Sequence, residues 1–188
     1  MKETKVICVF PACGRTYYIK NREDDNIVLN SNSTNFSWMQ RKRTAEELDE
    51  IRKEWDSVPH LLDGRGYINR IKNDLITVKN PDFPNNYIQY IKDNLGKVDY
   101  IFVDTHKEVI KALNDTGIDF TLIFPEQSLK EEWVGRCYLR GSGTTFCDLV
   151  ASQWDNWILD MEMEVVCNHR EHYRLKHGEY LSDALKHI

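Results

Sequence analysis

Four short apolar runs alternate with helix-forming stretches along the chain, and this alternation constrains the fold more than any other feature. The runs cover residues 6–10, 26–30, 99–105 and 119–125. Runs of this length and composition are typical of strands buried inside a parallel sheet. Strands separated by helices are joined by right-handed crossovers, which cover both faces of the sheet. The sequence therefore predicts an α/β fold of three layers.

Helix signals lie between and after these runs. Thr44 and Glu47 form a capping box, in which each side chain satisfies a backbone N–H of the other residue, before a helix that reaches about residue 55. Ser128 and Glu131 repeat the pattern. Further helices are predicted over residues 84–95, 106–114 and 145–166.

Length and charge restrict the class of protein. With 188 residues, of which 41% are hydrophobic, the chain is long enough to bury a core, and we expect a single domain over residues 1–188. Residues 32–82 contain one capped helix and few strand signals, which predicts a helical insert between the second and third strands. The net charge of −5 argues against an extensive nucleic-acid surface.

The expected cellular location follows from the lack of a membrane-spanning run and of a signal peptide. No apolar run reaches the roughly 20 residues that span a bilayer, and the first residues run into a strand without a cleavable signal pattern. The five cysteines include no C-x-x-C pair, which is typical of reduced thiols. We therefore expect a cytoplasmic protein with no membrane partner.

The first apolar run ends at a loop with the outline of a phosphate-binding loop. In the motif G-x-x-x-x-G-K-[ST], backbone N–H groups surround phosphates, lysine reaches the terminal ones, and the hydroxyl binds Mg²⁺. Aligned on Gly14, residues 9–16 read VFPACGRT, so Val9 replaces the first glycine and Arg15 replaces the lysine. An ordinary strand-to-helix turn is the alternative. The candidate phosphate-binding residues are Ala12, Cys13, Gly14, Arg15 and Thr16.

Ligands of open α/β sheets bind beyond the carboxyl ends of the strands, so the residues after each run are candidates for a site. Asp104 ends the third run, where P-loop proteins place a carboxylate near the Mg²⁺ held by the loop hydroxyl. Thr16 and Asp104 are therefore the candidate metal residues. Asp104 equally fits an N-cap of the following helix.

A kinase also needs fixed positive charge over the transferring phosphoryl group, often on a closing lid. Arg136 and Arg140 are four residues apart on a predicted helix that runs into a Gly-Ser-Gly joint, so both face one way. This arrangement predicts a lid over residues 128–145. Solvated arginines at a helix C-terminus are the alternative.

Seven sequence blocks carry a resemblance to a known family. In chain order they are FPACGRTYY, NSNSTNFSW, NPDFPNNYIQYIK, VDTHKEVIKAL, LKEEWVGRCYLRG, WDNWI and GEYLSD, and they extend over nearly the whole chain. In these blocks the chain resembles small phage-encoded nucleotide kinase-like proteins, which are relatives of nucleoside monophosphate kinases with the P-loop kinase fold. The resemblance implies phosphate transfer from ATP to a (deoxy)nucleoside monophosphate, Mg²⁺ as cofactor and a location in the host cytoplasm.

The resemblance also implies roles for individual residues. It places the donor phosphates on the loop at Gly14, Arg15 and Thr16, and it places the acceptor on the far side, next to the helical insert. The implied acceptor-binding residues are Asn30, Asn32, Ser33 and Trp38. The implied catalytic residues are Arg15, Asp104, Arg136 and Arg140.

The chain departs from the family pattern at the proposed chemical centre. Arg15 keeps a positive charge but directs its hydrogen bonds differently from lysine. Ala12 and Val9 replace glycines of the loop. Asn30 and Asn32 replace two carboxylates, and an amide neither accepts a proton as a base nor binds Mg²⁺ strongly. The alternative function is a catalytically impaired protein that sequesters or senses a nucleotide and acts on a host system through a protein partner.

Two further hypotheses complete the sequence reading. A polynucleotide-end kinase is a third hypothesis for the function. The set Cys167, His169, His172 and His177 offers thiol and imidazole ligands for zinc, although its spacing matches no well-defined zinc finger.

Overall fold

The chain forms two compact units in the computed structural model, which describes residues 3–57 and 74–188. The sheet unit combines Met1–Ser33 with Pro84–Ile188, and the insert unit is Thr34–Phe83. The insert unit covers nearly the same residues as the predicted insert, of which residues 58–73 lie outside the described part.

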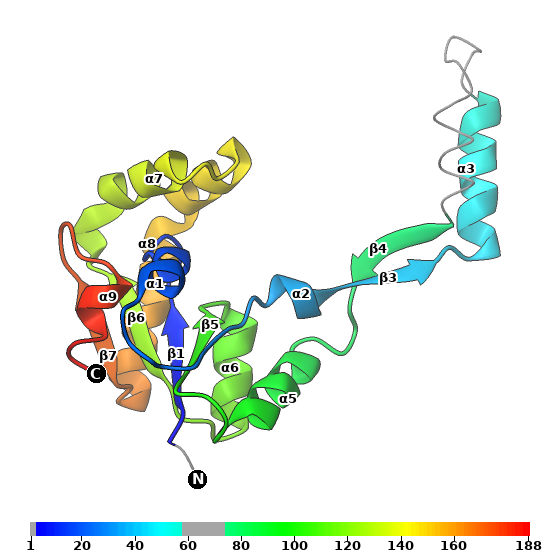
Figure 1. Cartoon of the computed structure of the whole chain (residues 1–188). Helices are drawn as coiled ribbons and strands as arrows, with labels where there is room; N and C mark the ends of the chain where they lie inside the picture. Colours follow the sequence, from blue (N-terminus) through cyan, green and yellow to red (C-terminus); the bar gives the residue numbers. More distant parts are fainter. Residues whose placement is uncertain (1–2, 58–73) are drawn as a thin grey trace. The chain divides into compact units, whose positions relative to one another are not determined.

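The sheet unit is built on five parallel strands in the order β2-β5-β1-β6-β7 (Figure 1). Four of the strands coincide with the four predicted apolar runs to within one or two residues at each end. The fifth, at the end of the chain, was not predicted, because its sequence HYRL contains no apolar run. The strands are β1 (Lys5–Val9), β2 (Val28–Asn30), β5 (Tyr100–Asp104), β6 (Thr121–Pro125) and β7 (His172–Leu175).

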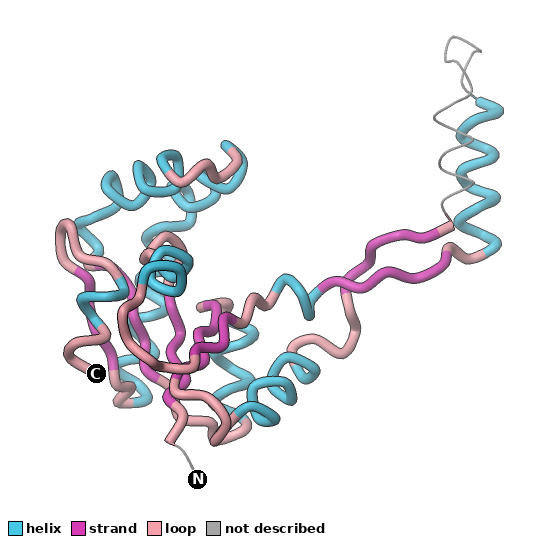
Figure 2. Tube along the Cα trace, viewed as in Figure 1, coloured by secondary structure: helices cyan, strands magenta, loops and turns pink. Residues whose placement is uncertain are grey.

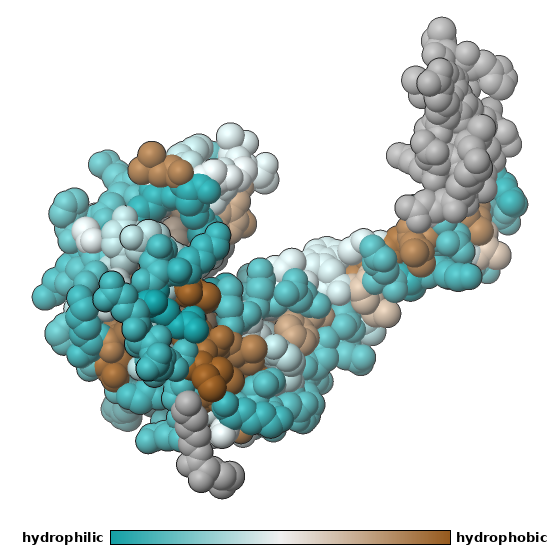
Figure 3. Space-filling view, in the orientation of Figure 1, coloured by the Kyte–Doolittle hydropathy of each residue, from teal (hydrophilic) through white to brown (hydrophobic). Residues whose placement is uncertain are grey.

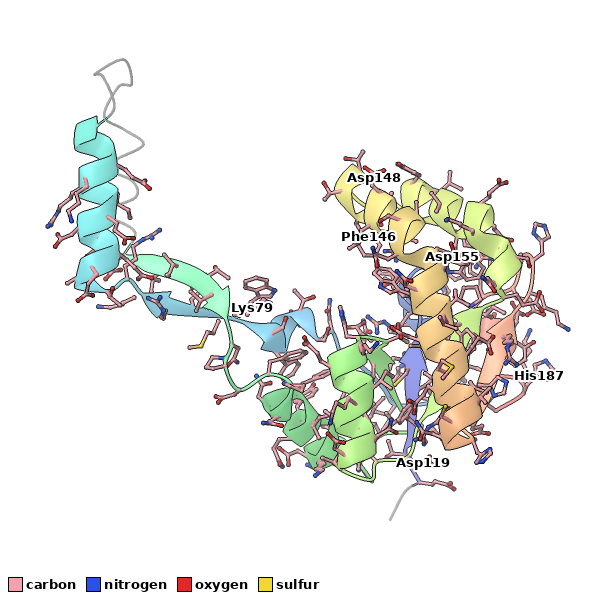
Figure 4. The ribbon with its side chains drawn as sticks, turned by 180° about the vertical axis from the view of Figure 1, so that it is seen from behind. Lys79, Asp119, Phe146, Asp148, Asp155 and His187 are labelled. Atoms are coloured by element: carbon pink, nitrogen blue, oxygen red, sulfur yellow. The ribbon has the colours of Figure 1, made fainter. Side chains whose placement is uncertain are left out.

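Helices cover both faces of this sheet. Helices α1 and α9 lie in front of it in Figure 1, whereas α5, α6 and α8 lie in front of it in Figure 4, which is seen from behind. This arrangement confirms the predicted α/β fold with a parallel sheet flanked by helices. The helices are α1 (Arg15–Asn21), α5 (Asn85–Asn94), α6 (Lys107–Asp115), α7 (Lys130–Leu139), α8 (Thr144–Asn168) and α9 (Leu181–Ala184).

The longest helix shows how the sheet unit buries its core. The buried residues of α8 recur every three or four positions, as the sequence predicts, and include Val150, Trp154 and Ile158. Trp154 packs edge-on against Phe10, with ring centroids 5.7 Å apart. On the face shown in Figure 3, hydrophilic residues cover most of the outside of this unit. Among the described residues, no helix combines the length and the apolar composition needed to cross a membrane.

The strand order defines where a ligand is expected to bind. From β1 the chain passes through α1 to β2 on one side, whereas from the neighbouring β5 it passes through α6 to β6 on the other. Neighbouring strands whose connections leave in opposite directions form a topological switch point, where open α/β sheets bind ligands at the carboxyl ends. The switch point of this sheet lies between β1 and β5.

The insert unit differs from the predicted helical insert. It contains α2 (Thr34–Ser37), β3 (Trp38–Lys42), α3 (Ala45–Ser57) and β4 (Leu75–Lys79), and its two strands form an antiparallel ribbon (Figure 2). The sequence analysis did not predict this ribbon. The strand WMQRK is mostly exposed and lacks the pattern of a buried strand, whereas LITVK does contain an apolar, β-branched run that was not interpreted as a strand.

Of the two predicted capping boxes, the structure bears out one. The Glu47 amide donates to Thr44 Oγ1 over 3.3 Å, and the Thr44 amide donates to the Glu47 carboxylate over 2.9 Å. The second prediction is wrong, because Ser128 lies inside a short 3₁₀ turn, Gln127–Leu129, and α7 begins only at Lys130 without a side-chain cap.

Candidate functional site

The loop between β1 and α1 turns through two residues with left-handed backbone, Ala12 with φ of 63° and Gly14 with φ of 87°. A left-handed conformation costs a non-glycine residue about 1–2 kcal/mol. The loop therefore holds Ala12 in a conformation that glycine adopts more readily. Such strain is characteristic of functional loops.

Replacing Ala12 by glycine is expected to stabilise the protein by about 0.5–1 kcal/mol. Glycine relieves the left-handed strain of about 1–2 kcal/mol, and its greater freedom in the unfolded chain offsets about 0.4–1 kcal/mol of this gain. Denaturant unfolding followed by tryptophan fluorescence measures the difference. Ala151→Gly in the interior of α8 is the control and is expected to destabilise by about 1 kcal/mol. A loss of stability in Ala12→Gly would show that the loop is not strained.

Contacts from distant segments hold the loop in this shape. The Leu181 amide donates to the Cys13 carbonyl over 2.8 Å, and Trp133 Nε1 donates to the Pro11 carbonyl over 2.9 Å. The Tyr180 ring covers Gly14 so closely that a Cβ there would lie 2.9 Å from Tyr180 Cδ1. The loop is therefore fixed from α7 and from the segment that leads into α9.

Cys13 of this loop is buried, with 1% exposure. Burial raises the pKa of its thiol above the usual range, although the positive charges of Arg136, Arg15 and Arg140 act in the opposite direction. The thiol is therefore held in its neutral form. The same three arginines therefore bring positive charge near the loop, and two of them are paired with the carboxylates Asp104 and Glu132.

Arg15 and Asp104 form an ion pair at the switch point. Arg15 Nη1 lies 3.0 Å from Asp104 Oδ1, and the two side chains are 19% and 20% exposed. The second carboxylate oxygen of Asp104 accepts a hydrogen bond from the Ser33 amide over 2.7 Å. Three of the predicted residues, from the ends of β1, β5 and β2, thus meet at one place. The helix-cap alternative for Asp104 is wrong, because His106 precedes α6 as its N-cap.

The predicted magnesium residues, Thr16 and Asp104, lie in different surroundings. Thr16 is exposed in the first turn of α1, and the Asp104 carboxylate is already engaged by a cation and an amide. Mg²⁺ requires free oxygen ligands in octahedral geometry. A metal at this position therefore requires Arg15 to leave Asp104.

The predicted zinc residues are not brought together. His172 Nδ1 lies 3.0 Å from the Arg170 carbonyl, His177 Nδ1 lies 2.7 Å from Glu132 Oε2, and Cys167 is exposed near the end of α8. In the described part of the chain, no group of three or more His, Cys, Asp or Glu side chains is placed to hold a metal ion.

The predicted acceptor residues belong to both units. Asn30 and Asn32 are exposed at and beyond the end of β2, and Ser33 is buried. Trp38 is 46% exposed and belongs to the insert unit. Sequence reasoning missed Tyr87 of α5, whose hydroxyl donates to the carbonyl of Ser31 over 3.0 Å and so supports this turn from inside.

The structure corrects the prediction that Arg136 and Arg140 face one way on a lid. Arg136 is buried, with 8% exposure, whereas Arg140 is exposed and donates from Nε to Ser142 Oγ over 2.6 Å. Arg140 also lies over the ring of Phe146, which Figure 4 labels in α8. In the turn between α7 and α8, the Ser142 amide donates a hydrogen bond to the Cys137 carbonyl. Only Arg136 lies next to the loop contacts described above.

Apart from His177 as a zinc candidate, the sequence assigned no role to residues 176–181, although their end forms part of the GEYLSD block. Glu132 of α7 accepts a hydrogen bond from the Gly178 amide over 3.1 Å and lies 2.7 Å from His177 Nδ1. Burial raises the pKa of Glu132, but the hydrogen bonds from Gly178, Arg136 and His177 outweigh it and hold the pKa below its usual value. The ionised carboxylate of Glu132 thus holds residues 177 and 178 against α7.

This contact predicts a loss of stability in acid. Because the pKa of Glu132 is lower in the folded than in the unfolded state, its contribution is present above the unfolded pKa and is lost as the pH falls through the folded pKa. Urea unfolding between pH 6 and pH 3 measures the effect. Glu132→Gln is expected to show a weaker decline than the wild type over this range, and an identical decline would contradict the assignment.

Two comparisons with known proteins identified no relative of this chain. A scan against family models and a search of curated proteins both found no match to this chain.

Proposed function

We propose that this protein binds a nucleotide through its phosphates at the carboxyl ends of β1 and β5. The observation that carries the proposal is the position of Arg15. Its guanidinium lies at the topological switch point, beside a loop with left-handed backbone, and its partner there is a single carboxylate. A phosphate group matches the fork of an arginine as well as a carboxylate does and bears more charge.

The surroundings of the loop support an anionic ligand. The charges of Arg136, Arg15 and Arg140 all act on Cys13 in the direction that favours a negative charge. The exposed Thr16 hydroxyl is a further hydrogen-bond donor. ATP, or another nucleotide, is the ligand that the resemblance to nucleotide kinase-like proteins favours.

Binding without efficient catalysis is the function that these residues support best. Asn30 and Asn32 offer amides where a kinase of the resembling family carries carboxylates, and Asp104 is held by Arg15 and Ser33. No free carboxylate among these residues is left to accept the proton of an acceptor hydroxyl. Such a protein sequesters or senses a nucleotide, and its effect is exerted through a protein partner.

Phosphate transfer from ATP to a (deoxy)nucleoside monophosphate is the second candidate. It is favoured by the resemblance and by the retained charge at Arg15, because phosphoryl transfer depends mainly on positioning and electrostatics. In this case, binding of phosphate draws Arg15 away from Asp104, and the freed carboxylate is available to Mg²⁺.

Calorimetry and a turnover assay distinguish the two functions. The purified protein is titrated with ATP, ADP and inorganic triphosphate, each with and without Mg²⁺, and ADP production is then followed with a panel of nucleoside monophosphates. Binding of ATP with little dependence on Mg²⁺ and no ADP production supports the first function. Acceptor-dependent ADP production establishes the second, and the absence of any binding contradicts both.

A further inference from the structure

Arg136 occupies an unusual position for a side chain of its kind. Its guanidinium carbon lies 4.0 Å from the ring centroid of Trp133 and 4.0 Å from that of Tyr180. Glu132 Oε1 accepts a hydrogen bond from Arg136 Nη2 over 2.5 Å. The stack formed by Trp133, Arg136 and Tyr180 joins α7 to the segment that leads into α9.

Each end of this stack also contacts the phosphate loop, residues 11–14. Trp133 donates from Nε1 to the Pro11 carbonyl, and the Tyr180 ring covers Gly14. Next to Tyr180, the Leu181 amide donates to the Cys13 carbonyl. A shift of either ring away from the guanidinium therefore changes a contact with the loop.

The chemistry of arginine suits this position better than that of other residues. A planar guanidinium stacks on two aromatic faces at once, which the compact ammonium group of lysine does not do. Arg136 Nη1 is buried and has no hydrogen-bond partner among the described residues. A buried donor without a partner is unfavourable, so a side chain that only filled space would be better replaced by an apolar one.

We infer that Arg136 is a positioning residue, which holds the phosphate loop in its binding conformation by clamping Trp133 and Tyr180 against it. The inference deepens the proposed function, because it assigns the group that keeps the phosphate-binding loop in place. Arg136 is also the foremost of the charges that act on Cys13, so it adds positive potential behind the loop.

The buried thiol of Cys13 reports directly on the position of the loop. Cys167 is the exposed cysteine of the chain, whereas Cys8, Cys13, Cys137 and Cys147 are buried. In a Cys167→Ser background, the rate at which a thiol reagent such as dithiobis(nitrobenzoic acid) modifies Cys13 therefore measures how often the loop opens. Peptide mass spectrometry identifies which cysteine has reacted, and no nucleotide is needed.

Arg136→Met is expected to accelerate the modification of Cys13 by about tenfold or more, because methionine fills the space but loses the cation–π contacts on both rings. Arg136→Lys is expected to behave like Arg136→Met, since it restores the charge without the planar stack. The matched control is Arg174→Met, which removes another arginine that is paired with a glutamate and lies over a ring, and it is expected to leave Cys13 protected.

Two results would overturn the inference. One is a Cys13 that stays as protected in Arg136→Met as in the control. The other is equal acceleration at Cys13, Cys137 and Cys147, which would mean that the substitution loosens the whole sheet unit. Trp133→Phe keeps an aromatic face but removes the hydrogen bond to Pro11 and part of the buried indole, so it tests the same loop if Arg136→Met does not fold. It is expected to accelerate Cys13 alone, and a protected Cys13 in this variant also contradicts the inference.

The proposed function is tested separately with the same proteins. If ATP binds the wild type, Arg136→Met is expected to weaken binding about tenfold or more, whereas Arg174→Met is expected to bind like the wild type. If ATP does not bind the wild type, the proposed function fails, while the rate of Cys13 modification still decides whether Arg136 positions the loop.

Discussion

Gly14→Ala is expected to lower the free energy of unfolding by about 2–5 kcal/mol. The left-handed backbone, with φ of 87°, costs alanine about 1–2 kcal/mol. The new Cβ also lies 2.9 Å from Tyr180 Cδ1, and overpacking of this kind costs about 1–3 kcal/mol. Denaturant unfolding monitored by tryptophan fluorescence measures the sum.

Gly141→Ala separates the two contributions to this effect. Gly141 has a similar φ of 77°, but an added Cβ would meet nothing within 4 Å. The control therefore carries only the backbone cost of about 1–2 kcal/mol. In a Tyr180→Ala background, Gly14→Ala is expected to cost little more than Gly141→Ala does in the wild type. The contact between the new Cβ and the Tyr180 ring is then absent, so the two sites are energetically coupled. Equal losses in Gly14→Ala and Gly141→Ala would show that Tyr180 yields freely and does not press on the loop.

Arg15→Ala is expected to weaken the binding of ATP by about 10- to 100-fold. A hydrogen bond between charged groups contributes about 1.5–3 kcal/mol, and each 1.4 kcal/mol corresponds to a factor of ten in affinity. Titration calorimetry measures the change. Lys107→Ala is the matched control, because it also removes a cation from an ion pair at 3.0 Å, with Asp160 on the surface, and it is expected to bind ATP like the wild type.

Asp104→Asn tests whether Asp104 competes with the nucleotide for Arg15. If Arg15 is shared between Asp104 and a phosphate, removing the negative charge of the carboxylate leaves Arg15 free, and ATP is expected to bind more tightly. A kinase that needs Asp104 would lose its turnover in the same variant. Unchanged affinity in both Arg15→Ala and Asp104→Asn would place the nucleotide elsewhere or exclude it.

Prediction of the fold succeeded where a local pattern reports burial. The run at residues 6–10 is β1, and the run at 119–125 contains β6, because central strands of a parallel sheet are buried on both faces and so are apolar throughout. Three of the described strands were not predicted. Of these, β4 does carry an apolar run, LITVK, whereas β3 and β7 were missed because they are not buried on both faces. Their side chains are largely exposed or half-buried, and their sequences WMQRK and HYRL carry no continuous apolar signal.

Prediction of the site succeeded in part for a similar reason. Arg15, Asp104 and Ser33 were chosen because each follows a predicted strand, and the carboxyl ends of parallel strands meet at one edge of the sheet. Helical spacing failed for Arg136 and Arg140, because it places two side chains on one face without revealing what covers them. Trp133 and Tyr180 bury the first arginine, and Tyr180 comes from a segment more than forty positions further along the chain.

Local sequence was thus sufficient for the parallel sheet, its flanking helices and the edge at which a ligand is expected, because apolar periodicity and capping patterns act over a few residues. The packing of distant segments settled the state of the site itself. The pairing of Arg15 with Asp104 and the burial of Arg136 between two rings both depend on which strands and loops become neighbours. Contacts of this kind arise from the order of the strands in the sheet, and no local pattern encodes that order.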